Sequence, residues 1–320
     1  MTGLPKQFRW TGIALWVAMM VSVGCTEDYQ TVSVDLSRRI STGQETRPPP
    51  ASGELRVAVA ATFSPQESLP YYQNLLDFIG SRIGRSVRVD RRRTYEEVNA
   101  LLGAGNIDLA FICSGPYVTG KGIFGFRPLA APFIMSKETY RSYLIVRRDS
   151  PIDRLDQLRG KTVAYTDPDS NTGCLLPRYL LFQRGEIDAR FFGKTIFTHS
   201  HDNSILAVSR NLADGAFVHE QIWEYLHRKK PEYTQGTRVI YRSEPFGNPP
   251  VVVSPKLAAS VADRIQQLLF SMHTDPDGRR ILDRLLVAQF VPVNESLYDP
   301  VRRMVSALKK EAADGSGQKP

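Results

Sequence analysis

The feature that most constrains this chain is a repeated alternation of short apolar runs with amphipathic segments. The body opens with the run ELRVAVAA at 54–61, which predicts a strand, and apolar residues then recur at helical spacing over 72–79. The order repeats, because SVRVDR predicts a strand, TYEE at 94–97 is a capping box that opens a helix, and IDLAFIC predicts a buried strand. Strands that alternate with helices predict an α/β fold with a mainly parallel sheet.

A second series of the same units begins near residue 140. Its predicted strands are RSYLIVRR, KTVAYT, KTIFTH and DGAFV, and two further strands, TRVIYR and VVVSP, follow. Helices are expected at about 172–183, from Asp202, and at about 255–273, 277–286 and 297–310. The two series predict two α/β lobes, in agreement with a length of 320 residues. The polar tail at 312–320 is expected to be frayed.

The N-terminus is typical of an exported protein. Two basic residues precede an apolar stretch at 10–24 that ends directly before Cys25, which is the order of a secretory signal. The stretch resembles a bacterial lipoprotein signal, in which residues 1–24 are removed and Cys25 is lipidated, although Ser22 stands where a leucine is usual. Residues 25–53 end in a proline-rich run and are expected to tether the anchor to the body. An ordinary cleaved or retained signal is the alternative.

Composition and charge narrow the class of protein. Lys and Arg number 41 against 33 Asp and Glu, hydrophobic residues make up 42%, and there are 3 cysteines, which excludes a disordered chain and a disulfide scaffold. Removal of residues 1–24 takes away two basic and no acidic groups, so the formal net charge of the remaining chain becomes 39 minus 33, or +6. That charge favours anionic ligands or a membrane surface. The arginine-rich run at 82–93 is interpreted as a solvated face, and no nucleic-acid partner is expected of an exported chain.

Motifs for catalysis are incomplete. The GKT triplet at 160–162 ends like a phosphate loop but lacks the loop's first glycine, and the HE pair at 219–220 lacks the second histidine of a zinc-protease helix. No serine elbow, C-x-x-C pair or dinucleotide glycine fingerprint occurs. We therefore expect no enzymatic activity, no cofactor and no metal site. Cys113 and Cys174 are either partners in a disulfide or two buried thiols.

Three turns place small polar residues between a predicted strand and a predicted helix. They are ICSGPY at 112–117, DPDSNTG at 167–173 and THSHDNS at 198–204. A helix N-terminus presents unpaired backbone N–H groups and the positive end of the helix dipole, so it can bind an anion without a full cation. The hydroxyls of Ser114, Ser170 and Thr172 and the ring of His201 add donors there. Because parallel sheets bind ligands at the carboxyl ends of their strands, the turns predict an oxyanion site, although each turn alone also fits a simple helix cap.

From about Leu55 to Tyr298 the order of motifs resembles the phosphonate-binding periplasmic proteins of ABC transporters. The matching stretches are TYEEVNALLGAGNIDLAFI, DSPIDRLDQLRGKTVAYTDPDSNTG, HDNSILAV, LADGAFV, RSEPFGNPPVVV and DPDGRRILDRL. The resemblance implies the two-lobed periplasmic binding protein fold (type II-like), with a hinge of two crossing strands and a ligand cleft between the lobes. Lobe 1 would comprise 54–140 plus 241–311, and lobe 2 would comprise 141–240.

The same resemblance implies the ligand and its contacts. Phosphonates, phosphite, phosphate or related small oxyanions are expected, held by residues 170–172 and His201 in the second lobe and by Tyr95 and Tyr117 in the first. The family commonly has an aspartate and a small polar residue where this chain has HE at 219–220, so contacts with the other end of the ligand differ here. The candidate ligand residues are Tyr95, Ser114, Tyr117, Ser170, Asn171, Thr172, His201 and Glu220.

These observations together predict a function. We expect a monomeric, extracytoplasmic solute-binding lipoprotein, held at the membrane by its lipid anchor, that captures a small phosphorus oxyanion for an ABC permease. The alternative is a ligand-sensing periplasmic protein that signals to a membrane receptor.

Overall fold

The structure is a computed structural model that describes residues 53–60 and 65–316. The predicted signal at 1–24, Cys25 and all but the last residue of the tether at 25–53 lie outside the described residues. Within the described part, no helix is both long enough and apolar enough to cross a membrane.

The first lobe is built on a six-stranded sheet with the order β13-β4-β12-β3-β1-β2. Its strands are β1 (Glu54–Val59), β2 (Ser86–Asp90), β3 (Leu109–Phe111), β4 (Arg127–Ile134), β12 (Val251–Val253) and β13 (Val287–Val291). Strand β1 pairs in parallel with β2 and β3, whereas β12 runs antiparallel between β3 and β4. The carboxyl ends of β1 and β3 therefore lie side by side at one edge of the sheet.

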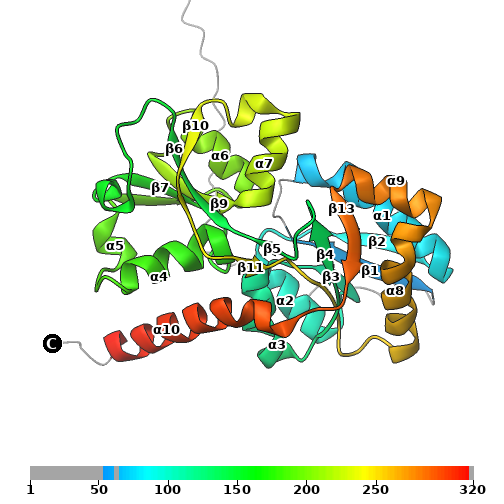
Figure 1. Ribbon diagram of the computed structural model, residues 1–320. Helices are drawn as coiled ribbons and strands as arrows, with labels where there is room; N and C mark the ends of the chain where they lie inside the picture. Colours follow the sequence, from blue (N-terminus) through cyan, green and yellow to red (C-terminus); the bar gives the residue numbers. More distant parts are fainter. Residues whose placement is uncertain (1–52, 61–64, 317–320) are drawn as a thin grey trace, which may run out of the picture. The chain divides into compact units, whose positions relative to one another are not determined.

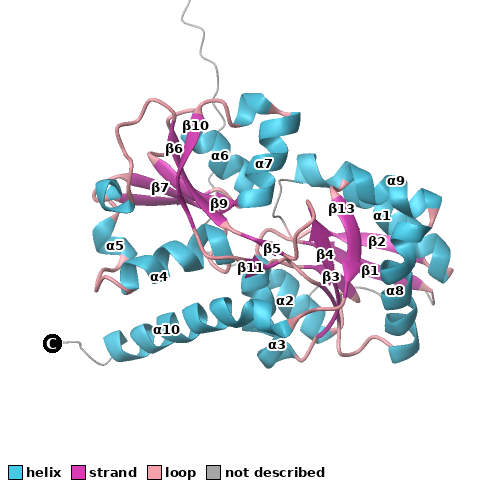
Figure 2. Ribbon diagram, viewed as in Figure 1, coloured by secondary structure: helices cyan, strands magenta, loops and turns pink. Residues whose placement is uncertain are grey.

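Helices cover both faces of this sheet (Figure 2). They are α1 (Pro65–Ile83), α2 (Tyr95–Ala104), α3 (Ser114–Phe124), α8 (Ala259–Ser271) and α9 (Pro276–Arg284). Successive strand residues point to opposite faces, so Val57 packs with α1, α8 and α9, whereas Ala58 packs with α2 and α3. The predicted capping box forms as expected, because the Thr94 hydroxyl accepts a hydrogen bond from the Glu97 N–H and the Glu97 carboxylate accepts one from the Thr94 N–H.

The second lobe is built on a five-stranded sheet with the order β10-β6-β9-β7-β8. Its strands are β6 (Ser142–Arg147), β7 (Thr162–Tyr165), β8 (Lys194–Phe197), β9 (Gly215–His219) and β10 (Thr237–Arg242). Its helices are α4 (Leu176–Phe182), α5 (Asp188–Phe191), α6 (His201–Ser209) and α7 (Glu220–Lys229). Helices α4 and α5 pack on one face of the sheet and α6 and α7 on the other (Figure 1).

Two short strands connect the lobes. Strand β5 (Thr139–Tyr140) carries the chain from β4 into the second sheet, and β11 (Phe246–Gly247) brings it back to the first. The two strands pair antiparallel, with Tyr140 opposite Phe246 (Figure 1). This arrangement confirms the predicted two-lobed α/β fold with a hinge of two crossing strands. The exact lobe boundaries stay a prediction, and strand β10 continues past residue 241 because Arg242 still pairs with Tyr143.

The last helix, α10 (Asp299–Ser316), packs differently from the expectation that 241–311 belongs to lobe 1. Its Val301, Met304 and Val305 lie in the apolar cluster of the second lobe with Leu175 and Leu176. Tyr298, directly before it, lies in the cluster formed by α2 and α3 of the first lobe. Helix α10 therefore runs from one lobe to the other beneath α4 (Figure 1).

Short helical turns complete the described structure. They are the 3₁₀ turns at Leu155–Leu158, Pro231–Tyr233, Met272–Thr274 and Glu295–Tyr298, and a π-helical turn at Asn171–Leu175 that leads directly into α4. The π-helical turn begins where the sequence places the second of its three polar turns.

Candidate ligand-binding site

The turn after β7 is shaped by a serine and a glycine. The Ser170 hydroxyl accepts a hydrogen bond from the Gly173 N–H at 3.1 Å and so caps the π-helical turn. A Cβ at Gly173 would lie 1.9 Å from Thr166 Oγ1, so only glycine fits against β7 there. Asn171 and Thr172 are thereby buried at the carboxyl end of β7, as expected of an anion site at the end of a parallel strand.

The N-terminus of α3 faces this turn from the first lobe. A Cβ at Gly115 would lie 2.1 Å from the Asp169 carbonyl oxygen, so the two lobes meet backbone to backbone at this point. Tyr140 of the hinge joins them, because its hydroxyl is hydrogen-bonded to the Ser114 hydroxyl and accepts from Asn171 Nδ2 at 2.9 Å. The Asp167 carboxylate makes a further link by accepting a hydrogen bond from the Tyr95 N–H at 3.2 Å.

Two buried histidines complete the arrangement. His201, the first residue of α6, accepts a hydrogen bond on Nδ1 from the His219 N–H at 3.2 Å, so the proton of the neutral ring is on Nε2. The His219 ring stacks on Tyr140 with 3.9 Å between ring centroids. Burial lowers the pKa of His201 to about 3, and burial with the nearby His201 lowers the pKa of His219 well below its usual value. Both rings are therefore neutral at pH 7.

We call Ser114, Tyr140, Asn171, Thr172, His201 and His219 the polar cluster. Four of its buried atoms have no hydrogen-bond partner among the residues that the structure describes, namely Asn171 Oδ1, Thr172 Oγ1, His201 Nε2 and His219 Nδ1. Buried polar atoms are nearly always hydrogen-bonded in folded proteins, so a group of unpartnered ones indicates a place for a bound molecule. Burial also raises the pKa of Tyr140 well above its ordinary value, so the cluster offers neutral donors and no cation.

The remaining predicted residues lie in different places. Tyr95 is buried beside Ala60 and Cys113 at the edge of the cluster. Tyr117 does not join it, because its hydroxyl donates to Glu295 and its ring packs on Tyr298 at 4.8 Å. One helical turn separates Tyr117 from Ser114, and the tyrosine faces the core of the first lobe instead of the cleft.

Glu220 is engaged at the edge of the hinge. Its carboxylate accepts hydrogen bonds from the Arg141 N–H at 2.8 Å and from Lys137 Nζ at 3.4 Å. The Tyr143 hydroxyl also donates to it at 3.4 Å. The carboxylate is thus already occupied by protein donors.

Two members of the polar cluster were not among the predicted ligand residues. Tyr140 lies on a strand of only two residues, which is too short to show a periodic pattern in the sequence. Its position as an aromatic residue at the predicted lobe boundary was the signal that could have indicated a ligand contact. In the sequence, His219 belongs to an incomplete zinc motif and to the pair that departs from the family pattern, and neither feature predicts it as a ligand residue. Its position at the end of a buried parallel strand was the better signal.

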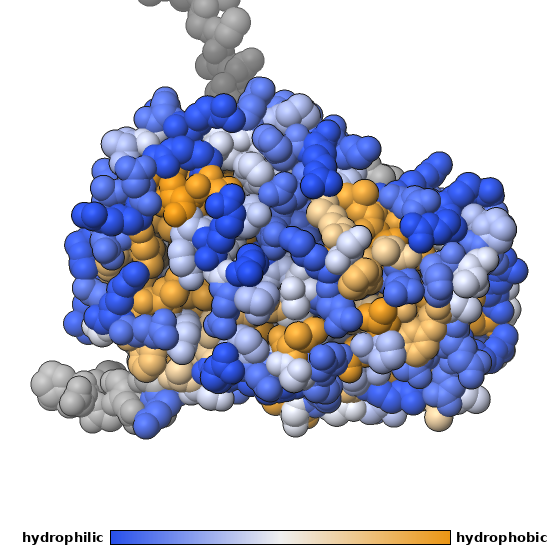
Figure 3. All heavy atoms as spheres, viewed as in Figure 1, coloured by the Kyte–Doolittle hydropathy of each residue, from blue (hydrophilic) through white to orange (hydrophobic). Residues whose placement is uncertain are grey.

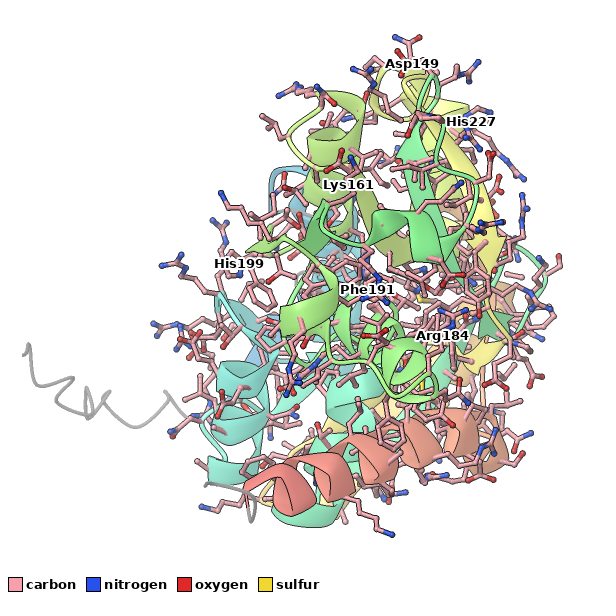
Figure 4. The ribbon with its side chains drawn as sticks, turned by 90° about the vertical axis from the view of Figure 1, so that its left-hand side faces the viewer. Asp149, Lys161, Arg184, Phe191, His199 and His227 are labelled. Atoms are coloured by element: carbon pink, nitrogen blue, oxygen red, sulfur yellow. The ribbon has the colours of Figure 1, made fainter. Side chains whose placement is uncertain are left out.

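Two further polar residues lie outside the polar cluster, Lys161 of the GKT triplet and His227 of α7. Lys161 is exposed at the amino end of β7, and His227 stacks on Trp223 and is hydrogen-bonded to Thr234 at 3.1 Å. Figure 4 shows both in the second lobe, well away from α10. Cys113 and Cys174 are free and buried, and burial raises the pKa of both thiols. Among the described residues, no group of His, Cys, Asp and Glu is arranged to hold a metal ion.

Comparison with known proteins places this geometry in a family. A family model described as "ABC transporter, phosphonate, periplasmic substrate-binding protein" matches residues 57–298. The phosphonates-binding periplasmic protein of Escherichia coli (strain K12) is 31% identical over 176 residues, which cover 54% of this chain and about half, 51%, of that protein. The phosphate-import protein PhnD of Mycolicibacterium smegmatis is 25% identical over 266 residues, or 76% of this chain and 82% of that protein.

Solved structures share the fold. A binding-protein component of an ABC phosphonate transporter from Pseudomonas aeruginosa aligns with a TM-score of 0.75 and 21% identity over 82% of this chain and 88% of that one. PhnD1 from Prochlorococcus marinus (MIT 9301), in complex with methylphosphonate, aligns with a TM-score of 0.73 and 17% identity over 81% of this chain and 100% of that one. With a family model that spans well over half of its length, this chain belongs to the periplasmic substrate-binding proteins of phosphonate ABC transporters.

Proposed function

We propose that this protein is a lipid-anchored binding protein that captures a small phosphorus oxyanion between its lobes and delivers it to an ABC permease. The oxyanion is held by neutral donors of the polar cluster and by the N-termini of α3 and of the π-helical turn. Closure is favoured only by ligands that contact both lobes at once. No bond is made or broken in the ligand.

The observation that carries this proposal is the set of unpartnered buried atoms in the polar cluster. Thr172 Oγ1 and His201 Nε2 can each donate one hydrogen bond, and neither has a protein acceptor in the described structure. A tetrahedral oxyanion offers several acceptor oxygens in a small volume, which fits donors that converge from separate turns. The neutral state of His201 at pH 7 means that the site offers its donors without depending on protonation.

The relatives support phosphorus as the central atom. One curated relative is named for phosphonates and another for phosphate import, and one structural neighbour holds methylphosphonate. The family itself supports transport over the sensing alternative.

The test is a titration of the mature protein with phosphate, phosphite, methylphosphonate, 2-aminoethylphosphonate, sulfate and a simple sulfonate. Trp223 of α7 is hydrogen-bonded to Thr237 at 3.1 Å and reports on the second lobe by fluorescence, while the melting temperature reports binding independently. We expect saturable stabilisation by at least one phosphorus oxyanion. No response to any of these compounds, in protein shown to be folded and ligand-free, would refute the proposal.

A matched pair of variants connects the response to the site. Thr172→Val removes a buried hydroxyl that has no protein partner and should weaken binding by roughly tenfold or more, since it removes a hydrogen bond to a charged group. Thr195→Val makes the same change at an exposed position of β8 and should leave binding unchanged. Equal affinities for the two variants would mean that the ligand lies elsewhere.

The anchor is tested separately. Membrane fractions of cells that express the full chain should contain the protein with an acylated Cys25, as measured by mass spectrometry. The Cys25→Ala variant should be found in the released fraction. Deletion of the adjacent permease genes, where they exist, should abolish uptake of the ligand without affecting its binding.

A further inference from the structure

An apolar cavity lies between the lobes next to the polar cluster. Its volume is about 130 Å³, and it is lined from the first lobe by residues such as Tyr72, Phe111 and Phe290 and from the second by His219 and Ile222. His219 belongs to both the cavity and the polar cluster, so the two adjoin at this side chain. In the space-filling view, apolar residues gather on the first lobe beside the second (Figure 3).

The described lining of the cavity offers no negative charge to pair with an ammonium ion. Among the described residues that line it, Arg284 carries the only full charge, which is positive, and no carboxylate is present. The carboxylate nearest in sequence, that of Glu220, already accepts hydrogen bonds from the Arg141 N–H and Lys137. An ammonium group held here would lose its water without gaining a counter-charge, which is strongly unfavourable.

We infer that the site takes a phosphorus oxyanion that bears one apolar, uncharged substituent, and that this cavity holds the substituent. The inference rests on the proposed function, because the polar cluster must hold the oxyanion for the cavity to receive its other end. A cavity of roughly 150 Å³ lined by aliphatic and aromatic residues in another protein holds benzene, so the room here suits a substituent up to about a phenyl ring.

The polar atoms at the cavity wall fit this assignment. Gln221 donates through Nε2 to Asn248 Oδ1 at 3.0 Å, which leaves its buried Oε1 without a partner among the described residues. The Gln221 Oε1 atom can accept a hydrogen bond from a hydroxyl on the substituent, and His219 Nδ1 lies near the oxyanion end, but neither supplies a negative charge.

The experiment is a calorimetric titration of ligand-free mature protein with methyl-, ethyl-, propyl-, butyl- and phenylphosphonate and with 2-aminoethylphosphonate. Each added methylene that enters the cavity should tighten binding about fourfold until the cavity is full. Propylphosphonate and 2-aminoethylphosphonate have nearly the same size and differ in the ammonium group. We expect the amine to bind at least about a hundredfold more weakly.

Variants that change the cavity volume locate the substituent. Ile134→Phe narrows the cavity from a half-buried position, so it should lower the ratio of phenylphosphonate to methylphosphonate affinity. Ile222→Ala widens the cavity and should move the optimum toward longer chains, which keeps the test valid if the first variant folds poorly. Ile123→Phe makes the same change as the first variant at a residue that is 68% exposed on α3, and it should leave all affinities unchanged.

The outcomes separate the two proposals. If methylphosphonate binds but affinity stays flat or falls along the alkyl series, or if the amine binds more tightly than the propyl compound, the inference about the substituent is overturned and the proposed function stands. If none of the phosphonates and no phosphate binds, both are overturned.

Discussion

Gly115 offers the most direct test of how the lobes close. Its missing side chain lets α3 approach the turn after β7, and a Cβ there would lie 2.1 Å from the Asp169 carbonyl oxygen and 2.9 Å from the Asn171 nitrogen. Both neighbours are backbone atoms, so neither can rotate away. In the Gly115→Ala variant the lobes must separate until this contact reaches an ordinary 3.4 Å, a shift of 3.4 minus 2.1, or 1.3 Å.

A shift of this size is large on the scale of a hydrogen bond. It would break the bond between the Tyr95 N–H and the Asp167 carboxylate, which is already 3.2 Å long. It would also draw the donors of one lobe away from a ligand held by the other. Loss of two hydrogen bonds to a charged ligand costs about 3–6 kcal/mol, which is roughly a 10²- to 10⁴-fold increase in Kd.

The assay is calorimetric titration with methylphosphonate and with phosphate, together with small-angle scattering of the ligand-free protein to detect opening. Alanine stabilises a helix interior by roughly 0.5–1 kcal/mol relative to glycine, so the substitution should not destabilise α3 itself. Gly122→Ala adds the same methyl group to the same helix, where nothing lies within 4 Å, and should behave as wild type. Wild-type affinity and scattering for Gly115→Ala would refute the reasoning.

Three further outcomes are expected. Burial lowers the pKa of His201 to about 3, against 6.5 in the unfolded chain, so the unfolded state binds more protons between these pH values. The free energy of unfolding should therefore fall by about 1.4 kcal/mol per pH unit as the pH drops from 6.5 toward 3. Urea titrations should show a shallower pH dependence for His201→Gln than for wild type, and an unchanged pH dependence would contradict this. Gly173→Ala should destabilise the protein by about 2 kcal/mol, because the new methyl group would lie 1.9 Å from Thr166 Oγ1. Adding Thr166→Ala removes that oxygen and should partly restore the stability. Additive losses in the double variant would speak against the contact. Asp275→Ala should lower the free energy of unfolding by about 1 kcal/mol, because Asp275 caps α9 by accepting hydrogen bonds from the Asp277 and Gly278 N–H groups. Asp283→Ala, on the exposed face of the same helix, should lower it by only a few tenths of a kcal/mol. Equal melting temperatures for the two variants would rule out the capping argument.

Much of the fold could be predicted because local signals and global structure agree. The capping box at Thr94 and the alternating strands of both lobes are local patterns, and they form where the sequence indicates them. Strand β4 gave no such signal, because Pro128 and Pro132 stand within it and proline is rare inside a sheet. Its position between β12 and β13 is set by tertiary pairing.

The site was only partly predictable for a related reason. Ser170, Asn171 and Thr172 follow a strand directly, so their location at its carboxyl end could be expected. Tyr117 could not be placed, because whether a helical residue faces the cleft or the core depends on how the helix is rotated against its sheet. Tyr140 becomes part of the site only when the hinge brings both lobes to it.

Helix α10 bears on how freely the lobes can move. Two hinge strands alone allow one lobe both to bend toward the other and to twist about the line of the hinge. The stretch from Tyr298, which packs in the first lobe, to Val301, which packs in the second, is a third crossing. It lies beside the hinge strands, because the Tyr298 hydroxyl donates a hydrogen bond to the carbonyl oxygen of Asn248, directly after β11, at 2.7 Å. Three crossings side by side form a broader connection that resists twisting more than bending, so opening and closing should follow a single rotation axis. A permease that recognises the closed form would then always meet its two lobes in the same mutual orientation.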